Sequence, residues 1–170
     1  MEVMMGEKKI GEINAEKKTT GKAVQYEMTS HVEAAMVVTV KVTNSTKSYW
    51  YNGMLTNSRA TRESNMPGQD QVTTVELKGS KYAVTINKKE KSETYPIKFC
   101  VTCLYYQEPV KDTTVYSEMQ GMYLSIKDLG NHQYELSQPK GKKDIYSYVN
   151  GKLQKIESIV AGKNVVFIVK

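Results

Sequence analysis

Residues 38–55 read V-T-V-K-V-T-N-S-T-K-S-Y-W-Y-N-G-M-L, and this stretch limits the fold that the chain can take. Its valines alternate with polar residues from Val38 to Val42, which is the period of two of a half-buried β-strand. The stretch ends in Asn52-Gly53, a pair that tolerates positive φ and favours the tight turn of a β-hairpin. It therefore predicts a strand with one dry and one wet face, followed by an antiparallel partner.

The same pattern recurs along most of the chain. The period of two returns in Tyr82, Val84 and Ile86, and the second Asn-Gly pair, Asn150-Gly151, predicts another hairpin. The composition agrees, because 18 Val, 9 Ile, 15 Thr and 12 Tyr far outnumber 7 Leu and 7 Ala. The sequence thus favours strands over helices.

About ten to twelve strands joined by short reversals make an antiparallel meander, which must curl or close as it grows. We predict a mainly β protein: a curved antiparallel meander forming a half-open or closed barrel, with one short helix packed against the sheet. A β-sandwich is the competing arrangement. No composition shift or long linker divides the chain, so residues 1–170 are expected to form a single β-rich domain.

The expected helix comes from one segment that breaks the period of two. Starting at Ile97, apolar residues fall at Cys100, Val101, Leu104 and Tyr105, which is the spacing of a helical stripe. This spacing predicts a helix of about 10 residues between two blocks of strands, with its stripe packed on the sheet.

The number and distribution of charged residues indicate which classes of binding partner to expect. Lys and Arg total 24 against 18 Asp and Glu, yet only Arg59 and Arg62 are arginines, and the lysines are scattered. Nucleic-acid sites depend on clustered arginine forks, so no nucleic-acid partner is expected. No uninterrupted run of about 18 apolar residues occurs, so the chain is not expected to span a membrane as a helix. The oligomeric state stays open.

Cysteine and histidine are the residues most often used in metal and redox chemistry. Cys100 and Cys103 have C-x-x-C spacing, but no α/β alternation surrounds them, so packed thiols are favoured over a disulfide or redox role and over a metal site. His31 and His132 show no ligand spacing. We therefore predict no metal, no cofactor and no catalytic residue.

Tyrosines gather in two segments that could border a groove. A tyrosine buries its ring while its hydroxyl seeks water or a partner, which suits a cavity rim as well as an ordinary β core. Two carboxylates flank the expected helix exit and the next strand, and such a pair can act as general acid and base. The candidate ligand-binding residues are Tyr49, Tyr51, Tyr105, Tyr106, Glu108, Tyr116, Glu118 and Tyr123.

One segment of the chain is similar to a known protein family. It spans residues 99–118 and reads F-C-V-T-C-L-Y-Y-Q-E-P-V-K-D-T-T-V-Y-S-E. Its Leu-Tyr-Tyr, Glu-Pro and Ser-Glu elements, with the following Gly121, resemble an uncharacterised Bacteroidetes-type family of small exported all-β proteins, classed as a domain of unknown function. The similarity extends to the opening segment 8–11 and to both Asn-Gly hairpins. It implies a periplasmic or secreted location and a leader that this chain lacks, and it implies no activity.

Together these observations lead to a functional expectation. The protein is expected to be non-enzymatic and exported, binding a lipid-like or other hydrophobic small molecule in a groove between the curved sheet and the helix. The alternatives are a hydrolase that uses Glu108 and Glu118, and a structural or protein-interaction module.

Overall fold

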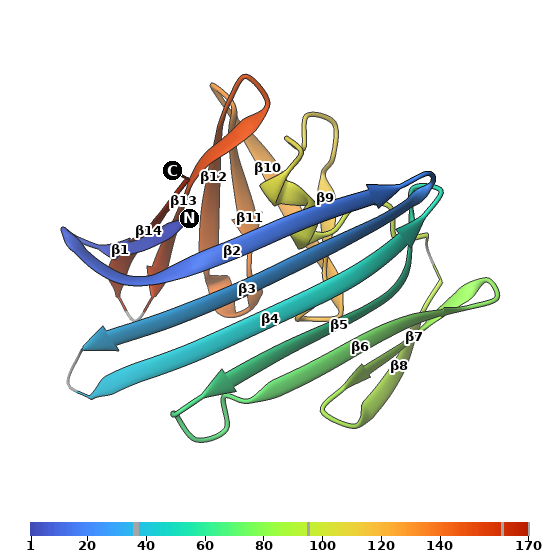
Figure 1. The fold of residues 1–170 in the computed structure, drawn as a ribbon, viewed down its shortest axis with the longest axis horizontal. Coiled ribbons are helices and arrows are strands. Elements are labelled where there is room, and N and C mark those ends of the chain that lie inside the picture. Colours follow the sequence, from blue (N-terminus) through green and yellow to red (C-terminus); the bar gives the residue numbers. More distant parts are fainter. Residues whose placement is uncertain (36–37, 95, 161, 170) are drawn as a thin grey trace.

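A computed structural model describes residues 1–35, 38–94, 96–160 and 162–169. The chain forms one antiparallel sheet of 14 strands that curls around a common interior (Figure 1). The strands are β1 (Glu2–Met5), β2 (Lys8–Thr20), β3 (Ala23–Ala35), β4 (Thr39–Tyr51), β5 (Met54–Ser64), β6 (Gln71–Lys78), β7 (Lys81–Ile86), β8 (Lys89–Glu93), β9 (Thr114–Ser117), β10 (Met122–Gly130), β11 (Gln133–Ser137), β12 (Lys143–Val149), β13 (Lys152–Val160) and β14 (Lys163–Ile168).

The sheet is a meander whose two ends come from the middle of the sequence. Its order runs β8 to β1, then β14 to β9, so β1 pairs with β14 at the centre. Strands β8 and β9 are the outer edges, and the sheet does not close between them. The predicted curved meander is confirmed in its half-open form, and the closed barrel is not what forms.

Local sequence accounts for the hairpins. Asn52 and Gly53 both have positive φ, as do Asn150 and Gly151, which is the backbone that a two-residue turn with the twist of the flanking strands requires. Both hairpins predicted from the Asn-Gly pairs are therefore confirmed.

The expected ten-residue helix is corrected to a single 3-10 helix, η1 (Val101–Tyr105), and a second short 3-10 turn, η2, spans Pro139–Gly141. The residues before η1 have extended backbone, and their carbonyls accept hydrogen bonds from neighbouring strands. Leu55 donates its N–H to Ile97 at 3.0 Å, and Tyr116 donates to Phe99 at 3.0 Å. Because these carbonyls are used by neighbouring strands, the helix begins only after Cys100. No helix within the described ranges is long and apolar enough to cross a membrane.

The interior holds three groups of packed side chains, and η1 lies between two of them. Cys103 packs with a cluster from β3 to β7 that includes Trp50, whereas Leu104 packs with a cluster from β9 to β13. A smaller third cluster, which includes Val3 and Ile10, lies under β1, β2, β3 and β14. The η1 segment contacts β3, β9 and β13, so it bridges the two halves of the curled sheet.

Candidate functional site

A cavity of about 410 Å³ opens on the inner face of the sheet, beside the third cluster. It lies within the size range of small-molecule sites, about 300 to 1,000 Å³. Strands β1 to β5 and β14 supply most of its wall. The apolar part of the wall includes Val3, Ile10, Val32, Val42, Val165 and Phe167.

The cavity exists because inward-facing side chains change in size along the strands. On β3 the inward face carries Tyr26 near one end and Ala34 near the other, and on β4 it carries Trp50 near one end and Val40 near the other. The aromatic ends belong to the packed first cluster, whereas Ala34 and Val40 line the cavity. Small residues at one end of two neighbouring strands thus leave space that the large residues fill at the other end.

A polar row crosses this apolar wall. Ser30, Asn44 and Arg62 are direct cross-strand neighbours on β3, β4 and β5, and all three line the cavity. Asn44 donates from Nδ2 to Oγ of Ser30 at 3.0 Å, and Arg62 donates from Nε to Oδ1 of Asn44 at 3.0 Å. The row therefore holds the guanidinium by a hydrogen bond to a neutral amide.

The charge of Arg62 has no ion-pair partner within the described ranges. The ion pairs in these ranges use lysine or histidine as the cation. The only side-chain hydrogen bond that Arg62 donates there is the one to Asn44. Burial lowers the pKa of Arg62, but an arginine stays protonated in proteins. The site therefore keeps a partly desolvated positive charge, with the exposed Lys142 also lining the cavity.

Four of the tyrosines expected to border a groove pack against the core clusters: Tyr116 is buried, whereas Tyr105, Tyr106 and Tyr123 are half-buried. Tyr116 is fully buried and stacks edge-on against Tyr123, with ring centroids 5.1 Å apart. Tyr106 packs against Tyr26 at 5.5 Å, and Tyr105 contacts the second and third clusters. Desolvation by burial raises the pKa of Tyr123 to about 12. These four tyrosines therefore contribute mainly to the core, and none of them lines the cavity of about 410 Å³. Tyr123 also borders a smaller hollow beside Pro96 and Phe99.

Tyr49 and Tyr51 do not join the other tyrosines. Their exposed fractions are 39% and 58%, and they project from the outer face of β4, whereas Trp50 between them is buried. The alternation predicted from the sequence is present, but it directs this pair away from the interior.

Glu118 is buried beneath η1. It accepts a hydrogen bond from the hydroxyl of Thr102, the second residue of η1. Burial raises the pKa of its carboxyl, although the hydrogen bond from Thr102 acts in the opposite direction. Glu118 therefore ties β9 and the turn after it to the 3-10 helix.

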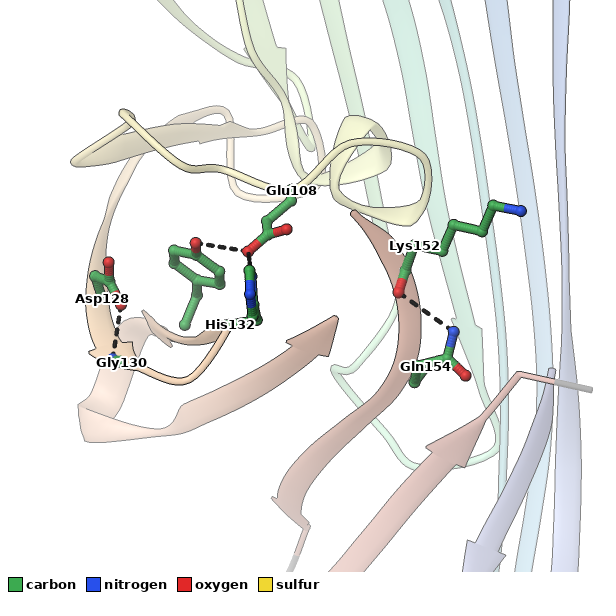
Figure 2. A network of polar contacts seen from close by, with 7 residues as sticks. Glu108, Asp128, Gly130, His132, Lys152 and Gln154 are labelled. Carbon is green, nitrogen blue, oxygen red and sulfur yellow. Dashed lines mark hydrogen bonds and ion pairs between the residues drawn. The ribbon is translucent and has the colours of Figure 1, made fainter. Parts of the chain in front are cut away.

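Glu108 belongs to a different network, shown in Figure 2. Its Oε1 accepts from the hydroxyl of Tyr134 at 2.8 Å and lies 2.7 Å from Nδ1 of His132. His132 is in the turn between β10 and β11, so this contact joins that hairpin to the segment after η1. Neither Glu108 nor Glu118 lines the cavity, and the structure does not gather the two carboxylates at that site.

The two cysteines are free thiols inside the first cluster. Burial raises the pKa of Cys103 to about 12 and that of Cys100 well above its ordinary value. Such thiols are poor nucleophiles and poor metal ligands, because both reactions need the thiolate.

The sequence patterns did not point to Arg62, Asn44 or the cavity. One signal was available, since Arg62 is one of only two arginines in the chain. The face of the sheet on which the Arg62 side chain lies could not be predicted by counting alternate residues from the Asn52-Gly53 turn. The reason is a bulge in β5 near Thr56, which shifts the alternation by one residue.

Comparisons with known proteins support the fold and name no activity. A crystal structure of a beta-barrel-like protein of the domain of unknown function DUF1849 from Brucella abortus is similar to this chain, with a TM-score of 0.61 and 10% sequence identity, over 99% of this chain and 93% of that one. At that identity the likeness concerns the fold alone. No curated protein matches the chain at a significant level. The family profile of DUF6134, described as a domain of unknown function, matches residues 1–170, and the chain therefore belongs to this family.

Proposed function

We propose that this protein is a non-enzymatic binding protein that takes up the apolar part of a small hydrophobic molecule in the cavity on the inner face of its sheet. The observation that carries the proposal is the cavity itself, about 410 Å³ in volume and walled mainly by aliphatic side chains. Transfer of apolar ligand surface from water into such a site is favourable by about 25 cal/mol per Å².

The lining side chains of the cavity are held in place by the sheet before any ligand binds, which favours a preformed site. Val32 and Val42 are direct neighbours on β3 and β4, and Val3 and Phe167 are direct neighbours on β1 and β14. Their backbones belong to continuous sheet ladders, so no ordering of loops is needed before these side chains can contact a ligand. Preorganisation of this kind lowers the entropy cost of binding.

The chemistry of the lining favours binding over catalysis. The described residues that line the cavity include no His, Cys, Asp or Glu. Ser30 and Ser64 are present, but a serine nucleophile needs a base within hydrogen-bond reach, and Ser30 instead accepts from Asn44. Apart from Lys142, whose side chain is exposed to solvent, the lining therefore lacks the usual groups for general acid and base chemistry.

Binding is tested with N-phenyl-1-naphthylamine, a neutral probe that becomes fluorescent in apolar sites. Val42→Trp adds bulk inside the cavity, and Val72→Trp makes the same change at an exposed position on β6. We expect saturable probe binding to the wild-type protein and to Val72→Trp, and at least a tenfold weaker affinity for Val42→Trp. Equal affinity of the two variants, or no saturable binding to the wild type, would contradict the proposal.

We further propose that the protein acts in the periplasm or outside the cell. The support for this location is the resemblance carried by the segment 99–118. Fractionation of cells that express the complete reading frame tests it, with a cytosolic enzyme and a periplasmic enzyme as markers. Recovery with the cytosolic marker would overturn the proposed location.

A further inference from the structure

Arg62 offers hydrogen-bond donors to the cavity that no described residue uses. A guanidinium carries five N–H donors, and the one on Nε is taken by Asn44. Within the described ranges, the donors on Nη1 and Nη2 have no protein acceptor. These two nitrogens form the planar end of the fork.

An unpaired, partly buried cation is an unusual feature of an apolar wall. Removing a charge from water costs free energy unless an opposite charge or hydrogen bonds replace the hydration. The hydrogen bond that Arg62 donates to Asn44 orients the guanidinium without neutralising it. The lining residues around it supply no carboxylate, so an anionic ligand group is the missing complement.

The shape of the site narrows the class of anion. A guanidinium fork matches a carboxylate in two parallel N–H···O hydrogen bonds. One negative charge balances the partly buried charge of Arg62, whereas the second lining cation, Lys142, is exposed to solvent. The volume of about 410 Å³ is near the lower end of the range for ligand sites, which favours one alkyl chain over the two chains of a diacyl lipid. From Arg62 on β5, the wall continues across β4, β3 and β2 to the apolar residues of β1 and β14.

We propose that the ligand is a single-chain amphiphile with a carboxylate head group, held by the Nη1 and Nη2 atoms of Arg62, with its alkyl chain along the apolar wall that includes Val32, Val42 and Phe167. This inference rests on the proposed function, because it names the ligand class of the same cavity. It assigns Arg62 as the residue that determines head-group specificity, and Asn44 as the residue that positions it.

The test compares three ligands with the same chain: dodecanoate, 1-dodecanol and dodecyl phosphate. Each is measured by its ability to displace N-phenyl-1-naphthylamine from the wild-type protein. We expect dodecanoate to bind at least about tenfold more tightly than dodecanol, and also more tightly than dodecyl phosphate. Equal affinity for dodecanoate and dodecanol would overturn the inference and leave the proposed function standing, since the probe would still bind.

Variants of the two arginines show which residue provides the preference. Arg62→Gln should bind dodecanol as the wild type does and lose the preference for dodecanoate. Arg62→Lys keeps the positive charge but loses the two-nitrogen end of the guanidinium, so it should retain only part of the preference for dodecanoate over dodecanol. Arg59→Gln is the matched control, because Arg59 lies on the same strand and is exposed. A preference for dodecanoate that survives in Arg62→Gln would overturn the assignment, as would tighter binding of dodecyl phosphate by the wild type. Failure of the probe itself to bind would overturn the proposed function together with the inference.

Discussion

Arg62 and Asn44 are directly paired across β5 and β4, and the Nε atom of the arginine lies 3.0 Å from Oδ1 of the asparagine. This contact holds a cation against the cavity wall without neutralising it. A residue arranged in this way lowers folding stability, because desolvation of its charge is not compensated within the described structure; the ligand proposed above would supply the missing compensation.

Replacing this cation should not destabilise the ligand-free protein. Methionine can pack its chain against the same aliphatic wall, so Arg62→Met is expected to raise the free energy of unfolding by up to about 1 kcal/mol. Urea denaturation of ligand-free protein measures the change, with Arg59→Met as the exposed control. A loss of more than about 1 kcal/mol in Arg62→Met alone would show that Arg62 stabilises the fold.

Gly121 is expected to be sensitive to any side chain. It has a φ of +61°, and a Cβ there would lie 2.9 Å from Cγ1 of Val84, where the turn after β9 packs on β7. Gly121→Ala should cost about 2 to 3 kcal/mol, from backbone strain plus displaced packing. Gly130→Ala is the control: its φ is +82°, but a Cβ there would meet no atom within 4 Å, so only the backbone cost of about 1 to 2 kcal/mol applies. Equal losses in thermal or urea denaturation would show that the contact with Val84 is unimportant.

Glu118 should make stability depend on pH. Burial raises its pKa in the folded protein above the ordinary value of 4.5, so the folded state holds the proton more tightly than the unfolded state does. Its contribution is therefore fully present below about pH 4.5 and is lost as the pH rises through the folded pKa. The free energy of unfolding of Glu118→Gln, minus that of the wild type, should increase over this interval by at most about 1.4 kcal/mol per pH unit. Parallel curves for the two proteins would refute this.

Cys100 and Cys103 should be nearly inert in the folded protein. With the pKa of Cys103 at about 12 instead of 9, the thiolate fraction at pH 8 falls by about a thousandfold, and burial further hinders the reagent. Reaction with 5,5′-dithiobis(2-nitrobenzoate) should therefore be at least about a thousandfold slower in native protein than in concentrated guanidinium chloride. Fast labelling of the native protein would mean that the first cluster opens readily.

The hydroxyl of Tyr82 should contribute measurably to stability. It donates to the carbonyl of Leu55 at 2.9 Å and accepts from the N–H of Ile97 at 3.3 Å, so it connects β7, β5 and the segment before η1. Tyr82→Phe leaves both backbone groups without this partner and should cost about 1 to 3 kcal/mol in urea denaturation. Tyr116→Phe is the control in the same cluster, because the buried Tyr116 hydroxyl has no hydrogen-bond partner within the described residues and its removal should cost almost nothing.

Strands and hairpins could be predicted because their determinants are local. A period of two in side-chain polarity defines the faces of a strand, and positive φ at Asn52 and Asn150 is favoured by the Asn-Gly pairs themselves. The curvature of the meander follows from the number of strands, since a long twisted sheet must coil.

The length of the helix was overestimated because the same spacing of apolar residues is compatible with extended backbone as well as with a helix. Cys100, Cys103 and Leu104 are buried, as the helical spacing requires, yet only the last two lie in η1. The backbone of Ile97 is captured by β5 through Leu55, a partner 42 residues earlier in the chain. Such distant pairing cannot be read from local periodicity.

The candidate site depends on a single inserted residue. Trp50 pairs with Leu55 while Tyr49 pairs with Asn57, so Thr56 is extra and the alternation of β5 shifts by one. Strict alternation from the buried Leu55 would turn Arg59 inward, whereas the shifted strand turns Arg62 into the cavity and leaves Arg59 exposed. By itself the sequence determined a curved antiparallel meander with tight Asn-Gly hairpins, since polarity and turn residues act over a few positions. Which arginine faces the interior, and where the space beside it lies, was decided only by strand register in the folded sheet, because a slip of one residue exchanges the two faces of a strand.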